Sequence, residues 1–178
     1  EGRAMHLMRA EVPGPTVGKL VPRMRSTAKI LYGLYLALTA AEVVFLVLGG
    51  MPFLDAVLAS FSTAGTGGFC IKNASIAFYN SAYIDGVITV FMILFGINFN
   101  LYYLILIKDF KQALKSEELR WYLGIIVAAV AAITINILGL YGNVVSALRY
   151  SSFQVGSIIT TTGFITADYG QWPMFSQA

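Results

Sequence analysis

Three long apolar blocks with almost no charge constrain this sequence more than any other feature. They cover residues 30–50, 86–107 and 121–140, and Glu42 is the one charged residue inside them. Each block meets the requirement of about 20 apolar residues for a helix that crosses the hydrocarbon core of a bilayer. The whole chain is 57% hydrophobic and 12% charged, whereas about a quarter of the residues of a soluble domain are charged. We therefore expect an all-α integral membrane protein.

The charged residues outside these blocks predict the topology. Basic residues concentrate in segments 1–28 and 108–120, whereas the connection 52–82 and the residues after 140 carry little charge. Cytoplasmic loops of membrane proteins are enriched in Lys and Arg, so we expect both basic segments on the cytoplasmic side. The basic residues of these segments are Arg3, Arg9, Lys19, Arg23, Arg25, Lys108, Lys111, Lys115 and Arg120, and Lys29 directly follows the first segment.

The sequence argues against nucleic-acid binding and against a structural metal site. Nucleic-acid binding is not expected, because the basic residues flank membrane spans and do not share one soluble face with aromatic residues. The single Cys70 excludes an internal disulfide, and with the single His6 it leaves no nitrogen or sulfur cluster for a structural metal. For segment 108–120 we prefer a topological role through anionic lipid over docking of a cytoplasmic partner.

The sequence repeats itself at an offset of 95 residues. At this offset Phe69 falls on Phe164, and four of the eight positions of 62–69 are identical to those of 157–164. The same offset lays the first apolar block onto the third. Agreement of a short motif and a hydropathy profile in one register indicates an internal repeat. We expect a complete unit over 29–107 and a second unit over 121–178 that lacks its closing span.

Each unit places a short segment between its first span and a loop of small residues. In the first unit this segment is 52–63, where Pro52 suits the start of a helix and Asp55 suits the positive end of its dipole. About twelve residues are too few to cross a bilayer, so the segment must enter the membrane and return. Non-helical backbone at membrane depth is tolerated where it lines a water-filled cavity, which indicates a pore.

The loops that follow have a composition that suits cation coordination. A narrow pore replaces the water around a cation by backbone carbonyls, and glycine permits the dihedral angles that aim those carbonyls. Residues 66–69 (Thr-Gly-Gly-Phe) and 161–164 (Thr-Thr-Gly-Phe) resemble the Thr-Val-Gly-Tyr part of the potassium-channel filter. The small residues could instead form an ordinary helix-packing surface, but two clusters in one repeat register favour a filter.

The motifs together resemble the Trk/Ktr/HKT superfamily of potassium transporters, and most closely its bacterial TrkH-type subunits. Three stretches carry the resemblance, and it covers essentially the whole chain: residues 9–15 (Arg-Ala-Glu-Val-Pro-Gly-Pro), 62–69 (Ser-Thr-Ala-Gly-Thr-Gly-Gly-Phe) and 160–169 (Thr-Thr-Thr-Gly-Phe-Ile-Thr-Ala-Asp-Tyr). The resemblance implies a channel-like fold of four span, pore helix, filter loop and span repeats around one pore. This chain would supply the second repeat and most of the third, with filter loops at 64–70 (the first loop) and 160–166 (the second loop).

The resemblance also implies site residues and partners. Gly68 and Gly163 would be the filter glycines, and four carbonyls would face permeating potassium: those of Thr66, Gly67, Thr161 and Thr162. No covalent cofactor and no catalytic residue are expected, so the chain is not expected to be an enzyme. The implied partners are membrane lipid, the missing repeats of the same polypeptide, a second copy in a homodimer, and a cytoplasmic nucleotide-binding regulatory subunit of TrkA type. The implied location is the bacterial inner membrane, with the filter loops near the outer side.

Two other functions compete with potassium conduction. A coupled cation secondary transporter would also place unwound backbone at the midplane, but through a helix broken at mid-span in place of a re-entrant hairpin. A non-conducting assembly subunit would keep the spans without needing Thr-x-Gly-Phe in register.

Six polar residues outside the loops have weaker expectations. For Glu42 we favour anchoring of the pore helix or loop over direct ion contact. Asn98 and Asn100 suit interhelical hydrogen bonds, and Arg149 suits an anchor at the membrane interface. Lys72 and Asp85 are expected to be solvated surface charges.

Overall fold

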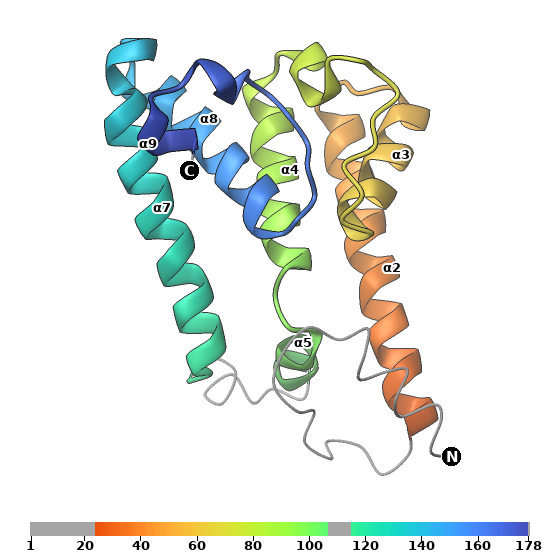
Figure 1. The fold of residues 1–178 in the computed structure, drawn as a ribbon. Helices are drawn as coiled ribbons and strands as arrows, with labels where there is room; N and C mark the ends of the chain where they lie inside the picture. Colours follow the sequence, from red (N-terminus) through yellow and green to blue (C-terminus); the bar gives the residue numbers. More distant parts are fainter. Residues whose placement is uncertain (1–23, 107–114, 178) are drawn as a thin grey trace.

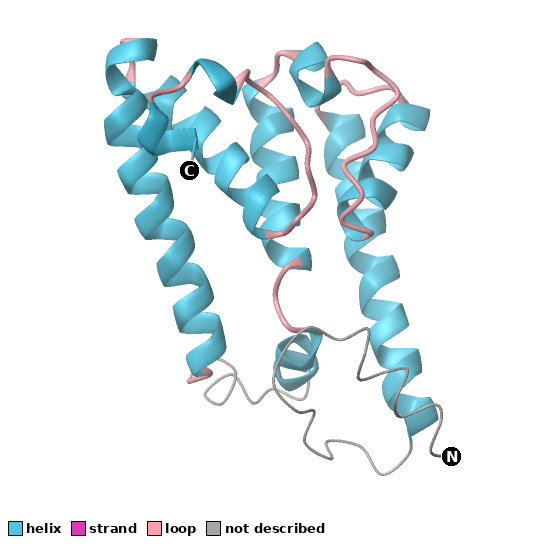
Figure 2. Cartoon of the chain, in the orientation of Figure 1, coloured by secondary structure: helices cyan, strands magenta, loops and turns pink. Residues whose placement is uncertain are grey.

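The computed structural model describes residues 24–106 and 115–177, and these form helices and loops without a strand (Figures 1 and 2). The basic segments expected on the cytoplasmic side lie mostly outside these residues. In chain order the elements are α2 (Met24–Leu48), α3 (Phe53–Ala64), η1 (Ser75–Tyr79), α4 (Ala82–Phe95), α5 (Phe99–Leu106), α7 (Glu117–Tyr141), α8 (Val144–Ile159), η2 (Tyr169–Gln171) and α9 (Met174–Gln177).

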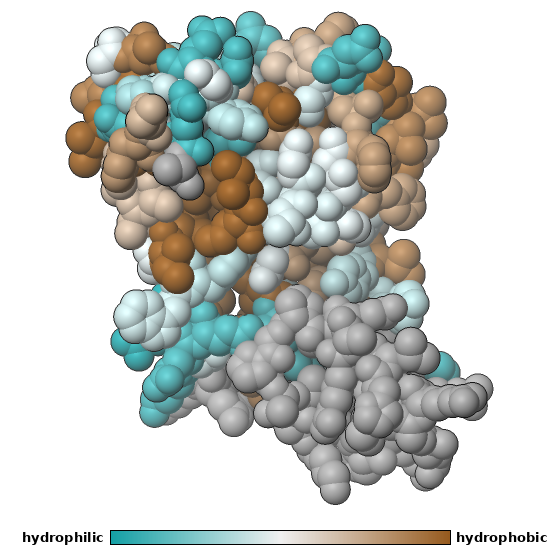
Figure 3. Space-filling model, viewed as in Figure 1, coloured by the Kyte–Doolittle hydropathy of each residue, from teal (hydrophilic) through white to brown (hydrophobic). Residues whose placement is uncertain are grey.

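Two of these helices are long and apolar enough to cross a membrane. They are α7 over its full length and α2 from Lys29 onward, and they match the first and third apolar blocks. Apolar side chains on both helices are exposed, among them Tyr32, Leu48, Trp121 and Ile135. Figure 3 shows hydrophobic patches on both sides of one face, near-neutral residues between them, and hydrophilic residues toward its upper edge. Exposed apolar side chains along two such helices suit contact with lipid.

A half-length helix follows each span and lies against it (Figure 1). The chain turns at Gly49 and Gly50, Pro52 caps α3, and the 12 residues of α3 run back beside α2. The prediction of a short helix over 52–63 is therefore confirmed. In the second unit Gly142 ends α7 in the left-handed region, and the Asn143 side chain accepts a hydrogen bond from the first turn of α8. Glycines thus lie at both reversals, and a polar side chain caps the second short helix, α8.

The second apolar block is broken, and the prediction of one uninterrupted span over 86–107 is wrong. α4 and α5 meet at an angle of 89°. Gly96 lies at the break, and a Cβ added there would overlap the Tyr122 hydroxyl. The side-chain oxygen of Asn98 accepts a hydrogen bond from the Asn100 amide at 3.0 Å, which caps the start of α5.

Two tyrosines satisfy the backbone carbonyls at the end of α4. The Tyr102 hydroxyl donates to the carbonyl of Leu94 at 2.7 Å, and the Tyr122 hydroxyl donates to that of Ile93 at 3.2 Å. Helix termini leave carbonyls without intrahelical partners, and these are costly in an apolar environment. The partners come from α5 and α7, so the break is stabilised by residues outside α4.

One hydrophobic core joins the two units. Its fully buried side chains come from α2, α3, η1 and α4 of the first unit and from α8 and the second loop of the second unit. Phe153 and Phe164 are the members from the second unit, and both are 0% exposed. The second loop is thereby held against the first unit.

Candidate functional site

The two candidate loops share an unusual backbone conformation at corresponding positions. Thr66 and Thr161 have φ angles of 49° and 56°, and Gly68 and Gly163 have φ angles of 66° and 87°. Both pairs are separated by the repeat offset of 95 residues. Positive φ is uncommon for a residue other than glycine. The agreement at two alternate positions shows that both loops follow the same path.

Hydrogen bonds at the base of each loop repeat in the same register. The Gly67 amide donates to the Ser62 carbonyl at 2.8 Å, and the Thr162 amide donates to the Ser157 carbonyl at 2.9 Å. Each loop is therefore tied to the last turn of the short helix before it, α3 or α8. The carbonyl ends of both helices face the loops, and their partial negative charge favours a cation there.

The first and second loops are in direct contact. A Cβ added to Gly68 would overlap the Thr162 carbonyl oxygen and lie 3.0 Å from the carbonyl carbon of Gly163. A side chain at position 68 is therefore excluded both by backbone conformation and by the neighbouring loop. A Cβ on Gly163 would meet nothing within 4 Å, so the far side of the second loop is open.

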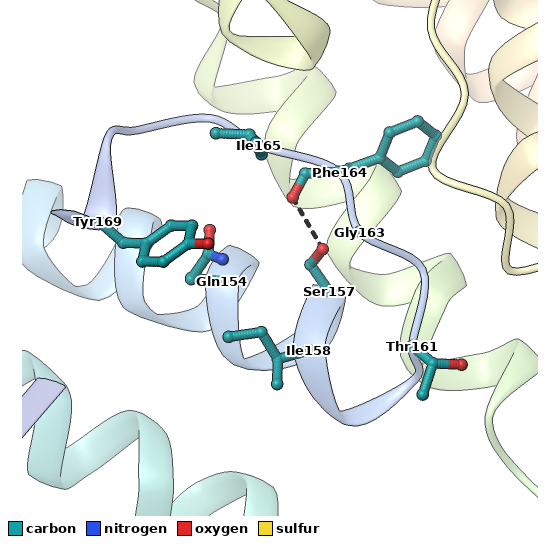
Figure 4. A pocket seen from close by; sticks show the side chains of 8 residues that line it. All are labelled: Gln154, Ser157, Ile158, Thr161, Gly163, Phe164, Ile165 and Tyr169. Carbon is teal, nitrogen blue, oxygen red and sulfur yellow. Dashed lines mark hydrogen bonds between the residues drawn. The ribbon is translucent and has the colours of Figure 1, made fainter. Parts of the chain in front are cut away.

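A pocket of about 220 Å³ lies on that open side, between α8 and the second loop (Figure 4). The residues that line it are Gln154, Ser157, Ile158, Thr161, Gly163, Phe164, Ile165 and Tyr169. Shifted back by the repeat offset, position 154 becomes Ala59 and position 163 becomes Gly68. Gly68 is where the second loop touches the first, and Ala59 shares a core cluster with Phe164. The pocket therefore has the same position relative to the second loop as the second loop has relative to the first loop.

The loops differ at the phenylalanine that ends each motif. Phe164 is 0% exposed, and its carbonyl accepts a hydrogen bond from the Ser157 hydroxyl at 2.8 Å (Figure 4). Phe69 is 80% exposed, and the corresponding hydroxyl of Ser62 is buried without a hydrogen-bond partner. The difference follows from the neighbours, because Phe164 has the first unit to pack against.

The structure brings together some of the predicted site residues. Gly68 contacts Thr162 and Gly163 across the two loops, whereas Thr66 and Thr161 are exposed at the loop starts. Which carbonyls face an ion stays a prediction, as do the boundaries of the two units.

Glu42 lies inside the protein and not on the loops. It is 0% exposed, and neither carboxylate oxygen has a hydrogen-bond partner. Its polar neighbour is Thr63 in the last turn of α3. The Thr63 hydroxyl donates its own hydrogen bond to the Ala59 carbonyl at 2.9 Å. Glu42 thus connects α2 with the end of α3, the contact expected of a residue that anchors this short helix.

The prediction that Asp85 is a solvated surface charge is wrong. Asp85 is 2% exposed in the first turn of α4, and its Oδ2 lies 2.7 Å from Nε of Arg149 in α8. Burial of a carboxylate requires such a partner. Arg149 is therefore bound to the other unit, whereas the sequence suggested an interfacial anchor. Its partner lies 64 residues away, so no local pattern could reveal the pair.

Other polar residues make contacts between elements. The Asn98 amide lies 3.3 Å from a carboxylate oxygen of Glu118 in α7, which confirms the expected interhelical hydrogen bond. The Tyr79 hydroxyl donates to Asp55 in the first turn of α3 at 2.5 Å. Burial, with this bond and the Asp55 charge, raises the pKa of the Tyr79 hydroxyl above its usual range. No local sequence pattern indicates the contact of Tyr79, because its partner lies 24 residues away.

The helical fold and its apolar spans agree with comparisons to known proteins. The profile of the TrkH family, described as "Cation transport protein", matches residues 3–178. The Trk system potassium uptake protein TrkH of Salmonella typhimurium is 35% identical over 175 residues, which are 96% of this chain and 36% of that protein. TrkG of Escherichia coli K12 is 32% identical over 171 residues, 94% of this chain and 35% of that protein.

A solved structure shows the same fold. The crystal structure of the potassium transporter TrkH from Vibrio parahaemolyticus superposes with a TM-score of 0.85 at 33% sequence identity. The match covers 96% of this chain and 37% of that chain, so this chain spans about a third of the length of the relatives it matches. The chain is therefore a membrane protein that belongs to the TrkH family of cation transport proteins.

Proposed function

We propose that this chain supplies two filter loops of a potassium-conducting pore. The carbonyls of Thr66, Gly67, Thr161 and Thr162 would replace the water around the ion, with Gly68 and Gly163 as the filter glycines. The observation that carries the proposal is the pair of positive φ angles that recurs in both loops at the repeat offset. Two loops cannot enclose an ion, so the pore requires further loops of the same kind.

The surroundings of the loops support this function. Both loops follow helices that lie against a span and turn back, and their non-helical backbone suits membrane depth only if it lines a protein or water-filled cavity. The pocket beside Gly163 has the position and lining expected of the seat for a further filter loop. The relatives are potassium uptake proteins of the Trk system, which favours potassium as the permeant ion.

The remaining parts of the proposal concern the complete polypeptide. It would hold four repeats, form a homodimer in the bacterial inner membrane, and bind a cytoplasmic nucleotide-binding subunit of TrkA type. The filter loops would lie near the outer side, and transport would need no covalent cofactor and no catalytic step. The relatives are named for potassium uptake and transport, and this chain covers about a third of their length.

Rubidium uptake by the complete protein tests the filter. In cells without other potassium uptake, Gly163→Val should abolish rubidium uptake at unchanged protein level, because valine cannot adopt a φ of 87° without strain. Gly139→Val is the matched control, since a Cβ on that glycine of α7 meets nothing within 4 Å. Wild-type uptake and selectivity in Gly163→Val would refute the filter, and would favour a non-conducting assembly subunit.

A second candidate, coupled cation transport, is favoured by the broken α4–α5 pair. Secondary transporters place discontinuous helices at the midplane, and in this chain α4 and α5 form an apolar pair that is bent by 89°. In proteoliposomes that hold the complete protein, a pore predicts a reversal potential set by the potassium gradient alone. A reversal potential that shifts with an imposed proton or sodium gradient would favour coupling.

A further inference from the structure

The outer part of the second loop is bound by a segment of the first unit. The Ile165 amide donates to the Ser75 hydroxyl oxygen at 3.2 Å, and the Ile165 carbonyl accepts from the Ala77 amide at 3.1 Å. Both backbone polar groups of the residue after the Thr-Thr-Gly-Phe motif are thus bound by η1. The two segments lie 90 residues apart in the sequence and side by side in the fold (Figure 1).

Ser75 adopts a conformation that a side chain normally avoids. Its φ angle is 54°, and its amide donates to the Lys72 carbonyl at 2.9 Å in the turn before η1. Glycine is the usual residue in this region, because it has no Cβ to crowd the following carbonyl. Serine at this position costs conformational free energy, yet it supplies the acceptor that glycine lacks.

The second loop and α8 form a hairpin, and this hairpin is also attached to the first unit through α8. Arg149, in the second turn of α8, pairs with the buried Asp85 of α4. Phe164, just before Ile165, lies in the core shared with the first unit. The hairpin of α8 and the second loop is therefore attached to the first unit on both limbs. Its own helix holds the inner part of the loop, through the Thr162 amide and the Ser157 carbonyl.

We propose that Ser75 is a positioning residue for the second filter loop and thereby contributes to cation selectivity. The inference rests on the proposed function, because it assigns Ser75 a role toward carbonyls that would coordinate potassium. Selection between cations by backbone carbonyls depends on the number and placement of those carbonyls. Ser75 fixes Ile165, two residues after Gly163, so its hydroxyl limits how far the Thr162 and Gly163 carbonyls can shift outward.

Two substitutions in the complete protein separate this role from a general effect on folding. Ser75→Ala removes the acceptor and keeps a Cβ at positive φ, whereas Ser75→Gly removes the acceptor and relieves the backbone. Both should lower the ratio of rubidium to sodium permeation about fivefold, the factor that corresponds to one hydrogen bond of ordinary strength. Ser75→Gly should do so without lowering the protein level. Ser75→Asn keeps an acceptor oxygen in a residue that tolerates this conformation, and should retain more selectivity than Ser75→Ala.

Ser81→Ala is the matched control. The Ser81 hydroxyl lies in the same connection, and the hydrogen bond that it accepts, at 3.4 Å, comes from the Ile84 amide of its own helix and not from the second loop. It should lower stability slightly and leave the permeation ratio unchanged. A wild-type ratio in Ser75→Ala or Ser75→Gly would overturn the role of Ser75, even where Gly163→Val still abolishes rubidium uptake. Failure of Gly163→Val to change uptake would instead refute the proposed filter.

Discussion

The clearest test of the two-loop geometry is Gly68→Ala, compared with the same change at the adjacent glycine. Alanine at position 68 takes up a φ of 66°, and left-handed backbone costs an L-residue about 1–2 kcal/mol. Its methyl group would also overlap the carbonyl oxygen of Thr162. Restoring an ordinary contact requires that oxygen to move by roughly 1 Å, and overpacking of this kind costs about 1–3 kcal/mol.

Gly67→Ala should cause much less backbone strain and steric overlap than Gly68→Ala. Position 67 is absent from the residues with positive φ, and the added Cβ would lie 2.8 Å from the ring of Phe69, an exposed side chain that can move aside. The repeat gives independent support, because Thr162 corresponds to Gly67 and carries a side chain in the same backbone register. We therefore expect Gly67→Ala to cost about 1 kcal/mol or less.

The assay is rubidium uptake by the complete protein, with sodium as the competing ion and the thermal midpoint of the purified protein as a measure of folding. Gly68→Ala should lose about 2–5 kcal/mol of stability or, if the fold absorbs the change, most of its rubidium selectivity. Gly67→Ala should keep most of the stability and most of the rubidium selectivity of the wild type. Equal effects of the two substitutions would show that the contact between Gly68 and the Thr162 carbonyl does not exist in the working protein.

Three further predictions follow from individual contacts. Arg149→Gln should lower the free energy of unfolding more than Asp85→Asn, by a difference of about 1–3 kcal/mol, because it leaves a carboxylate that is 2% exposed without its partner, whereas Arg149 is 22% exposed; equal losses would contradict the burial of the carboxylate. If a further filter loop fills the adjacent pocket, Gly163→Ala should lower the stability of the complete protein as much as Gly68→Ala does. A loss of only about 1–2 kcal/mol of stability would show that the pocket stays open. Tyr79→Phe should cost about 1–2 kcal/mol near neutral pH, since the hydroxyl donates to a carboxylate. Because the pKa of Tyr79 is raised in the fold, wild-type stability should fall above the ordinary tyrosine pKa of about 10, and denaturant titrations should show a smaller fall in Tyr79→Phe.

The long apolar helices and the half-length helix α3 could be predicted because their signals are local. A block of about 20 apolar residues can satisfy its backbone in a bilayer only as a helix, and a 12-residue segment next to such a block is too short to cross it. The positions of the loops were equally accessible, since the repeat offset aligns Gly68 with Gly163. The conformations of these loops then agree with that alignment.

The break in the second span could not be predicted from local sequence. Residues 96–98 (Gly-Ile-Asn) lie inside an uncharged block, and hydropathy alone does not distinguish a bend from a straight helix. The hydroxyls that make the bend possible belong to Tyr102 and Tyr122, and the latter is on α7. Ser75 and Asp85 were missed for the same reason, since their partners, Ile165 and Arg149, lie in the other unit.

The burial of Phe164 has a consequence for the order of synthesis. The core around Leu46, Ala59 and Ile88 is completed by a side chain that leaves the ribosome long after α2, α3 and α4 have been made. The first unit can insert its spans early, but it cannot reach its final packing until the second loop has arrived. Truncations that end between residues 107 and 164 should therefore insert into membranes and yet remain more sensitive to proteases than chains that include Phe164.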